Sequence, residues 1–288
     1  MKVLDLFSGI GGFSLGLERA GFETVAFCEI EHYCQKVLAK HWPEVPIYDD
    51  IRRLDADTLR QDGITPDVIC GGFPCQDLSF AGRRAGLEGE RSGLWGEYSR
   101  LIGELRPRFV IVENVPGLLS LGMGTVLGDL ASLGYDATWD CIPASAVGAP
   151  HRRDRVWIVG YTNENRQPAR AVYDEASKLC CDVADASGSR LPHDQGSATS
   201  TQRHRNGTVD GCRRPDGKYD HWRVEPDVGR VAHGVPNRVD RLKALGNSVV
   251  PQIPELIGHA IMRAIHEAPQ RLPVERRQGR QDNTAQIS

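Results

Sequence analysis

Short apolar runs alternate with helical stretches over residues 1–160, and this alternation restricts the fold more than any other feature of the sequence. Five runs rich in β-branched residues end at turn or polar residues, as buried parallel strands do; they are residues 2–7, 24–28, 67–70, 109–112 and 156–160. Between them, apolar residues recur at helical spacing in residues 12–20, 32–41, 94–105 and 126–133. The sequence therefore predicts an α/β fold with a mostly parallel, Rossmann-like sheet.

The regularity ends at Gly160, so the chain is predicted to have four parts. Residues 1–160 form the large domain. Residues 161–240 are rich in Gly, Ser, Asp, Arg and His with few apolar runs, which predicts a small, irregular domain without a large core. Residues 241–266 regain helical periodicity and are expected to return to the large domain, whereas the polar residues 267–288 are expected to form a flexible tail.

The composition excludes several classes of protein. Apolar residues make up 40% of the chain, but no apolar run approaches the roughly 20 residues that span a bilayer. Asp5 interrupts any signal-peptide core at the amino terminus, so we do not expect export. The eight cysteines form no Cys-x-x-Cys pair. We expect them to be reduced thiols of a cytoplasmic protein that binds neither a membrane nor a metal.

A basic cluster within residues 161–240 is a candidate for nucleic-acid contact. It is interleaved with aromatic residues and diluted by three acids, and its basic members are Arg203, Arg205, Arg213, Arg214, Lys218 and Arg223. The formal net charge of −3 neither demands nor excludes nucleic acid, because phosphate contacts come from local clusters. A solvated loop region and a nucleic-acid surface are both compatible with this cluster.

A glycine-rich loop, Gly9-Ile10-Gly11-Gly12, follows the first predicted strand. Ser14 stands where the third glycine of a Gly-x-Gly-x-x-Gly pattern would be, which disfavours a dinucleotide and favours a smaller nucleoside ligand. Glu29 ends the second predicted strand about twenty residues later, and Asp50 follows another short apolar run. Each acid alone is more often a helix cap or a turn residue. The ordered set of loop and acids predicts a nucleoside pocket.

Cys75 follows the strand at residues 67–70 after the sharp exit Gly71-Gly72-Phe73-Pro74. Most free cysteines are small buried apolar residues, but this thiol is presented at the carboxyl end of a strand. Glu113 ends the next strand and should lie beside it, so thiol and carboxylate form a candidate catalytic pair. Arg153 and Arg155 precede the last strand, where they hold a phosphate or a base edge or are simply solvated.

These motifs, in this order, resemble those of the cytosine-5 DNA methyltransferases of bacteria and phages. The matching segments are Asp5-Leu6-Phe7-Ser8-Gly9-Ile10-Gly11-Gly12, Glu29, Asp50-Ile51, Gly72-Phe73-Pro74-Cys75-Gln76, Glu113-Asn114-Val115, Arg152-Arg153-Asp154-Arg155 and Gly246-Asn247-Ser248-Val249-Val250-Pro251. The likeness spans residues 1–160 and 241–265. It implies a Rossmann-like methyltransferase domain and makes residues 161–240 a small target recognition domain.

The resemblance implies S-adenosylmethionine as the methyl donor. In the family's pattern Phe7 stacks on adenine, Glu29 holds the ribose, and Asp50 and Ile51 frame the adenine. The remaining implied cofactor contacts are Ile10, Gly11, Gly12, Ile30, Pro74, Leu94, Asn247 and Val249.

The resemblance also implies that the substrate is a flipped cytosine in double-stranded DNA. Cys75 adds to carbon 6 of this base while Glu113 interacts with ring nitrogen 3. Arg153 and Arg155 match the family's arginines for base and backbone, and Arg230 joins the predicted DNA contacts. We expect a monomer of the bacterial cytosol that either accompanies a restriction endonuclease or is encoded by a phage or prophage.

Two features depart from the family pattern. His151 replaces the usual Gln at the head of the arginine motif, and residues 161–240 are short for a target recognition domain, so the DNA sequence is not assigned. Three alternatives stand beside the methyltransferase: a non-catalytic DNA-binding relative, an RNA cytosine-5 methyltransferase of the same fold, and a NAD-type dehydrogenase. The pair of Cys75 and Glu113 disfavours the first, and the glycine spacing disfavours the last.

Overall fold

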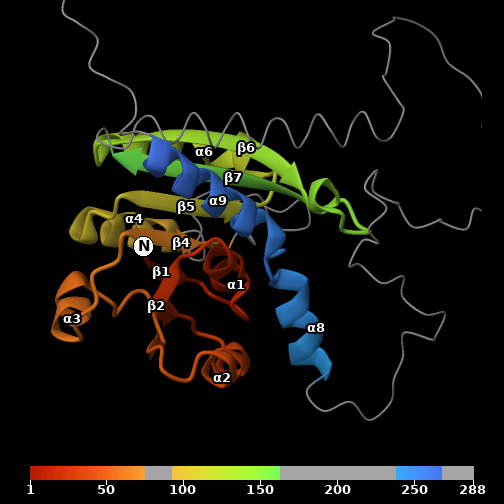
Figure 1. Ribbon diagram of the computed structural model, residues 1–288, viewed down its shortest axis with the longest axis horizontal. Coiled ribbons are helices and arrows are strands. Elements are labelled where there is room, and N and C mark those ends of the chain that lie inside the picture. The colour runs from red at the N-terminus through yellow and green to blue at the C-terminus, as the bar shows by residue number, and fades with distance from the viewer. Residues whose placement is uncertain (75–92, 163–237, 268–288) are drawn as a thin grey trace, which may run out of the picture.

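The computed structural model describes residues 1–74, 93–162 and 238–267, which form one sheet with helices on both faces (Figure 1). The strands are β1 Lys2–Leu6, β2 Glu23–Cys28, β3 Ile47–Tyr48, β4 Val68–Gly71, β5 Phe109–Asn114, β6 Tyr135–Pro143 and β7 Asp154–Thr162. The helices are α1 Gly12–Arg19, α2 His32–His41, α3 Ala56–Gln61, α4 Leu94–Leu105, α5 Leu118–Leu121, α6 Met123–Ser132, the 3₁₀ helix η2 Ala144–Val147, α8 Arg238–Asn247 and α9 Gln252–Glu267. Most of the predicted small domain and nearly all of the predicted tail lie outside the described residues.

The predicted α/β fold with a mostly parallel sheet is confirmed. Within the described ranges the strand order is β3-β2-β1-β4-β5-β7-β6. β1 pairs in parallel with β2 and β4, and β4 pairs in parallel with β5. β7, however, is antiparallel to both of its neighbours, β5 and β6. The prediction of residues 156–160 as a parallel strand was therefore wrong in direction, because an apolar run does not reveal which way a strand runs in the sheet.

The sequence analysis did not find β6, because an edge strand needs little apolar burial. Only Tyr135 and Ile142 of its nine residues are buried, and Trp139 is 44% exposed. The short helix α3 was also missed, and α8 continues through Gly246 and Asn247, although both are typical turn residues. No helix in the described parts of the chain has the length and apolar character of a bilayer span.

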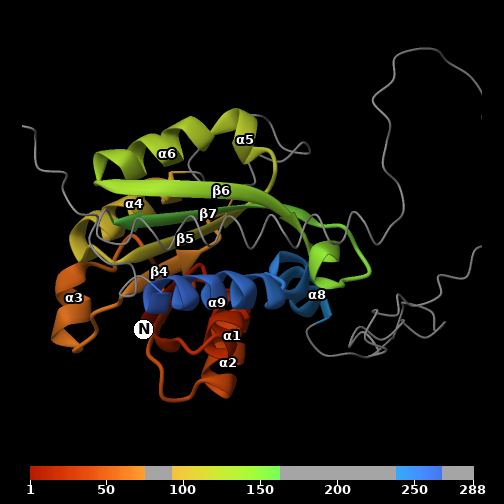
Figure 2. The ribbon, with the colours of Figure 1, turned by 45° about the horizontal axis from the view of Figure 1, so that its top comes forward.

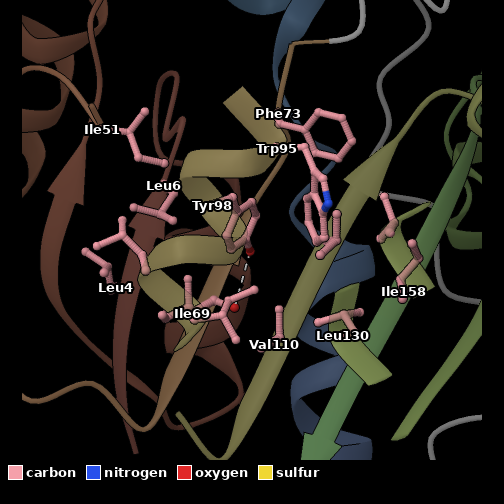
Figure 3. Close-up of a cluster of buried hydrophobic side chains, with 14 of the residues drawn as sticks. Leu4, Leu6, Ile51, Ile69, Phe73, Trp95, Tyr98, Val110, Leu130 and Ile158 are labelled. Carbon is pink, nitrogen blue, oxygen red and sulfur yellow. Dashed lines mark hydrogen bonds between the residues drawn. The ribbon is translucent and has the colours of Figure 1, made fainter. Parts of the chain in front are cut away.

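Two apolar layers hold the helices on the sheet. Because side chains alternate along a strand, Leu4 faces the layer under α3, α4, α5 and α6, whereas Val3 faces the layer under α1 and α9. Figure 2 shows α6 and α9 on opposite sides of the strands. Ile69 and Val110 on the neighbouring strands extend the first layer, and Figure 3 shows them close to the side chains of α4. The strands are therefore covered on both faces, as a parallel sheet requires.

The helix α9 packs against α1, although the two lie at opposite ends of the described sequence. Gly16 of α1 lies so near the return segment that a Cβ atom there would be 2.1 Å from the carbonyl oxygen of Pro251. Gly258 of α9 is similarly close to α1, since a Cβ atom would lie 2.7 Å from Cβ of Ala20. Glycine at these two positions therefore allows the backbones to approach closely.

We expect Gly16→Ala to lower the free energy of unfolding by about 1–3 kcal/mol, because the added methyl group would overlap the Pro251 carbonyl oxygen. Gly128→Ala in α6 is the matched control, since nothing lies within 4 Å of a Cβ atom at that position. The control should stabilise the protein by about 0.5–1 kcal/mol through reduced chain entropy in the unfolded state. Urea unfolding measures both changes. Equal responses of the two variants would contradict the close contact between α1 and the return segment.

Candidate active site

The ends of four neighbouring strands meet at one edge of the sheet. β2, β1, β4 and β5 are adjacent and parallel, so the residues that follow them share that edge. Phe7 follows β1, Glu29 follows β2, residues 72–74 follow β4, and Glu113 lies at the end of β5. The sheet therefore gathers the main predicted site residues from segments that are far apart in the sequence.

The loop after β1 has a backbone conformation that residues with a side chain rarely adopt. Gly9 and Gly11 have φ angles of 55° and 85°, which glycine takes without steric cost. Phe7 has a φ angle of 53°, and this left-handed conformation costs a residue with a side chain about 1–2 kcal/mol. Strain of this kind is concentrated at binding sites, where the surrounding structure holds it in place.

Glu29 holds this loop against the end of β2. One carboxylate oxygen of Glu29 accepts the N–H of Gly9 at 2.6 Å, and the other accepts the N–H of Glu31 at 2.7 Å. Burial raises the pKa of Glu29 above its ordinary value, and these two backbone N–H groups act in the opposite direction. Each carboxylate oxygen can accept a further hydrogen bond, so Glu29 can also receive the hydroxyl groups of a sugar.

Asp5 supports the same loop from within the core. It is fully buried on β1, and its carboxylate accepts both the N–H and the hydroxyl of Ser14, at 3.3 and 2.7 Å. Ser14 lies in the first turn of α1, so Asp5 fixes the start of the helix from outside it. Burial raises the pKa of Asp5 to about 7, although the hydrogen bonds from Ser14 lower it. The sequence analysis gave Asp5 no separate role; its signal was an acid inside an apolar strand.

The segments after β2 and β3 present an acid and two aliphatic residues. Arg52 donates to both carboxylate oxygens of Asp50, and the shortest of these bonds, from Nη2, is 2.6 Å. These bonds are the main cause of the lowered pKa of Asp50, which is therefore an ionised acceptor at neutral pH. Ile51 is buried, whereas Ile30 after β2 is 64% exposed. An exposed aliphatic side chain, which stands between Glu29 and Glu31 in the sequence, fits contact with a flat apolar ring.

The return segment closes against the glycine loop. A Cβ atom on Gly12 would lie 2.7 Å from the carbonyl oxygen of Val249, so the two backbones are in close contact. Arg153 donates from Nη2 to the carbonyl oxygen of Ser248 at 2.8 Å. Asn247 ends α8 directly before this contact. The structure therefore places Val249 against the glycine loop and joins the arginine motif to the return segment.

Glu113 lies in a confined, charged setting at the end of β5. Its carboxylate pairs with Nε of Arg155 at 2.8 Å, and its side chain is only 14% exposed. A Cβ atom on Gly72 would lie 2.7 Å from the other carboxylate oxygen, so a larger residue there would displace this side chain. Burial raises the pKa of Glu113, while Arg155 and Arg153 oppose the rise. Glu113 is thus a carboxyl group with an increased tendency to carry a proton.

Asn114 and an aromatic stack fix the segment that leads toward residue 75. The amide nitrogen of Asn114 donates to the carbonyl oxygen of Phe73 at 3.4 Å. The Phe73 ring packs on Trp95 of α4, with 5.4 Å between ring centroids (Figure 3). The Tyr98 hydroxyl, also on α4, donates to the carbonyl oxygen of Ile111 at 3.1 Å. The exit from β4 is therefore held by β5 and α4 together, and the sequence analysis did not foresee these contacts.

The structure brings several of the predicted site residues into contact. Glu113 contacts Arg155, Glu29 contacts the glycine loop, and Gly12 contacts the return segment, so these are brought together. Pro74 and Leu94 are half-buried and border residues 75–92, which lie outside the described residues. Other predicted site residues lie outside the described parts of the chain; they are Cys75, Arg203, Arg205, Arg213, Arg214, Lys218, Arg223 and Arg230.

Comparison with known proteins gives one consistent family. The sequence profile of the family described as C-5 cytosine-specific DNA methylase matches residues 1–214. The Type II methyltransferase M2.BsuMI of Bacillus subtilis is 41% identical over 167 residues, which are 55% of this chain and 41% of that protein. The Type II methyltransferase M.DsaV of Dactylococcopsis salina is 32% identical over 189 residues, which are 64% of this chain and 52% of that protein. The chain thus spans about half, or less, of the length of these relatives.

One solved structure supports the fold. A protein described as a DNA modification methyltransferase encoded within a prophage of E. coli is 29% identical to this chain, with a TM-score of 0.51. The match covers 58% of this chain and 48% of the other. The Rossmann-like methyltransferase fold predicted from the sequence is therefore confirmed.

The buried carboxyl group of Asp5 should make stability depend on pH. The folded-state pKa of Asp5, about 7, lies above the ordinary value of 3.8. The contribution of this carboxyl group to the free energy of unfolding is therefore fully present below pH 3.8 and is lost as the pH rises toward 7. Over that window we expect Asp5→Asn to remove up to about 1.4 kcal/mol per pH unit from the slope of unfolding free energy against pH. Urea unfolding at several pH values measures the slope. Asp57→Asn, which changes an exposed acid, should leave the slope as in the wild type; an unchanged slope in Asp5→Asn would refute the assignment.

Proposed function

The chain belongs to the C-5 cytosine-specific DNA methylase family, and we propose that it transfers a methyl group from S-adenosylmethionine to carbon 5 of a flipped cytosine in a specific duplex DNA sequence. The observation that carries this proposal is the half-buried ion pair of Glu113 and Arg155 beside the exit from β4. That exit leads directly in sequence to Cys75, the proposed nucleophile.

The residues at the strand edge fit S-adenosylmethionine. The glycine loop offers backbone close to the methionine part, and Glu29 retains acceptor capacity for ribose hydroxyls. Asp50 is an ionised acceptor for the 6-amino group of adenine, with the exposed Ile30 available to the flat face of the ring. Phe7 offers an aromatic face. When bound, S-adenosylmethionine supplies an electrophilic methyl group on a sulfonium centre.

Cys75 acts as the nucleophile because carbon 5 of cytosine is too electron-poor to accept a methyl group unaided. The Cys75 thiolate forms a bond to carbon 6, and the electron pair of the 5,6 double bond becomes available at carbon 5. After carbon 5 has accepted the methyl group, its proton leaves and the bond between Cys75 and carbon 6 breaks. The products are 5-methylcytosine and S-adenosylhomocysteine.

Glu113 stabilises the adduct by holding a proton at ring nitrogen 3. Its burial favours the protonated carboxyl, which can donate to that nitrogen as negative charge develops on the ring. Arg155 orients this carboxyl through their 2.8 Å contact and carries positive charge toward the base. Arg153 is anchored to the return segment and holds the arginine motif in place.

Duplex DNA is the proposed substrate, and the cytosine must leave the stack because carbons 5 and 6 are inaccessible within it. Residues 161–240 are proposed to contact DNA through their basic cluster, with phosphate contacts for position and base-edge contacts for sequence. The relatives named above are Type II methyltransferases, which supports a role in restriction-modification or in protecting phage DNA. We further propose that the chain acts as a monomer.

Trapping tests the nucleophile directly. Duplex DNA of random sequence that contains 5-fluorocytosine should form an adduct that survives a denaturing gel, because fluorine cannot leave carbon 5 as a proton does. Cys75→Ser should form no adduct and transfer no methyl group, yet retain DNA binding in a gel-shift assay. Cys141→Ser, which changes a half-buried cysteine on β6, should form the adduct as the wild type does. An adduct in Cys75→Ser would overturn the assignment.

Glu113→Gln tests the acid. The amide keeps the shape of the side chain but cannot give up a proton, so we expect kcat to fall by about 10²–10⁴-fold. Radiolabelled methyl transfer at saturating S-adenosylmethionine measures the change. Glu255→Gln, which changes a half-buried acid of α9 that pairs with Arg19, should keep wild-type kcat. A Glu113→Gln enzyme with kcat near the wild-type value would rule out a proton-holding role.

A further inference from the structure

Arg100 of α4 binds four acceptors that come from different segments of the chain. Its Nε donates to Glu97 and its Nη1 to Glu104, both at 2.8 Å and both within α4. Its Nη2 donates to two backbone carbonyl oxygens, that of Ile51 at 3.0 Å and that of Leu54 at 2.8 Å. The guanidinium therefore joins α4 to the turn that begins at Asp50.

This turn is closed by its own backbone and is joined to α4 through Arg100. The N–H groups of Arg53 and Leu54 both donate to the carbonyl oxygen of Asp50, which closes the turn on itself. The side chains of Ile51 and Leu54 are buried, and backbone carbonyls in such a setting need partners. For Ile51 and Leu54 those partners are the N–H groups of Arg100.

Glu104 adds a second link between α4 and the segment that contains the turn. One of its carboxylate oxygens accepts from Arg100, and the other accepts the N–H of Ala56 at 3.0 Å. The turn is therefore held at both ends by α4. Two acids fix the guanidinium, and its planar, forked donors reach acceptors in several directions, which the single ammonium group of a lysine cannot do.

The turn held by Arg100 carries Asp50 and Ile51, which the proposed function assigns to adenine. We propose that Arg100 is a positioning residue that sets Asp50 at the 6-amino group of the adenine and so gives the cofactor pocket its preference for that base. The inference rests on the proposed function, because it takes S-adenosylmethionine as the ligand of this pocket. Arg100 itself acts through the turn and touches backbone, not ligand.

Calorimetry on the full chain tests the proposal with two probes, S-adenosylhomocysteine and its analogue with hypoxanthine in place of adenine. A carboxylate accepts from the 6-amino group but faces an oxygen in the analogue, so we expect the wild type to prefer the adenine probe about tenfold. Arg100→Met should weaken binding of the adenine probe about tenfold and leave the analogue nearly unchanged, which removes the preference. Arg100→Lys should lose most of it.

Two further variants make the readout specific. Arg60→Met is the matched control, since Arg60 bonds Asp57 and the carbonyl oxygen of Glu104 but not the turn, and it should keep the preference. Asp50→Ala should lose the preference by itself, and adding Arg100→Met to it should change the ratio of the two affinities no further.

The outcomes separate this inference from the proposed function. If the wild type binds neither probe, the proposed function fails and the inference fails with it. If the wild type prefers the adenine probe and Arg100→Met keeps that preference, the function stands and the inference is overturned. Equal weakening of both probes together with a lower Tm would show a merely structural role, which also overturns it.

Discussion

Parallel pairing of β1 with β2 and β4, and of β4 with β5, is the constraint on which the rest of the structure depends. It brings the exits of all four strands to one edge, where each chain segment must leave without colliding with its neighbour. β1 and β4 approach so closely that a Cβ atom on Gly71 would lie 2.6 Å from the carbonyl oxygen of Leu6. A Cβ atom on Gly72 would similarly lie 2.7 Å from a carboxylate oxygen of Glu113. Small residues at the exit from β4 therefore allow this segment to leave the sheet between Leu6 and Glu113.

Three buried or nearly buried carboxyl groups lie along this edge, and each is compensated in a different way. Asp5 accepts two hydrogen bonds from the start of α1, Glu29 accepts two backbone N–H groups, and Glu113 pairs with the Arg155 guanidinium. In all three, burial is the largest influence on the pKa and raises it. The hydrogen bonds to Asp5 and Glu29 hold the loop proposed for the cofactor. Glu113 keeps a raised pKa beside Arg155, and the methyl-transfer proposal requires such a carboxyl group to hold a proton.

The helix α4 connects the two halves of the proposed site. Through Arg100 it holds the turn at Asp50 on the adenine side, and through Trp95 it supports Phe73 before the proposed nucleophile. Tyr98 lies between them, with its ring 6.2 Å from that of Phe7 and 5.5 Å from that of Trp95. One rigid element thus contacts the segments assigned to cofactor and to base. It begins at Leu94, close to the end of the gap in the described residues that contains Cys75.

The sequence by itself predicted many of the strands and helices and the candidate site residues, because periodicity and glycine content are local properties. Runs of apolar residues located β1, β4 and β5, and the acids that follow or end such runs identified Glu29 and Glu113. Only the tertiary structure decided the antiparallel direction of β7, the bonds between Arg153 and Ser248, and the clamp of Arg100 on Ile51. Those contacts join residues 95 and 49 positions apart. Such pairs form because packed helices and a folded sheet bring them within hydrogen-bond distance, and no local pattern encodes that distance.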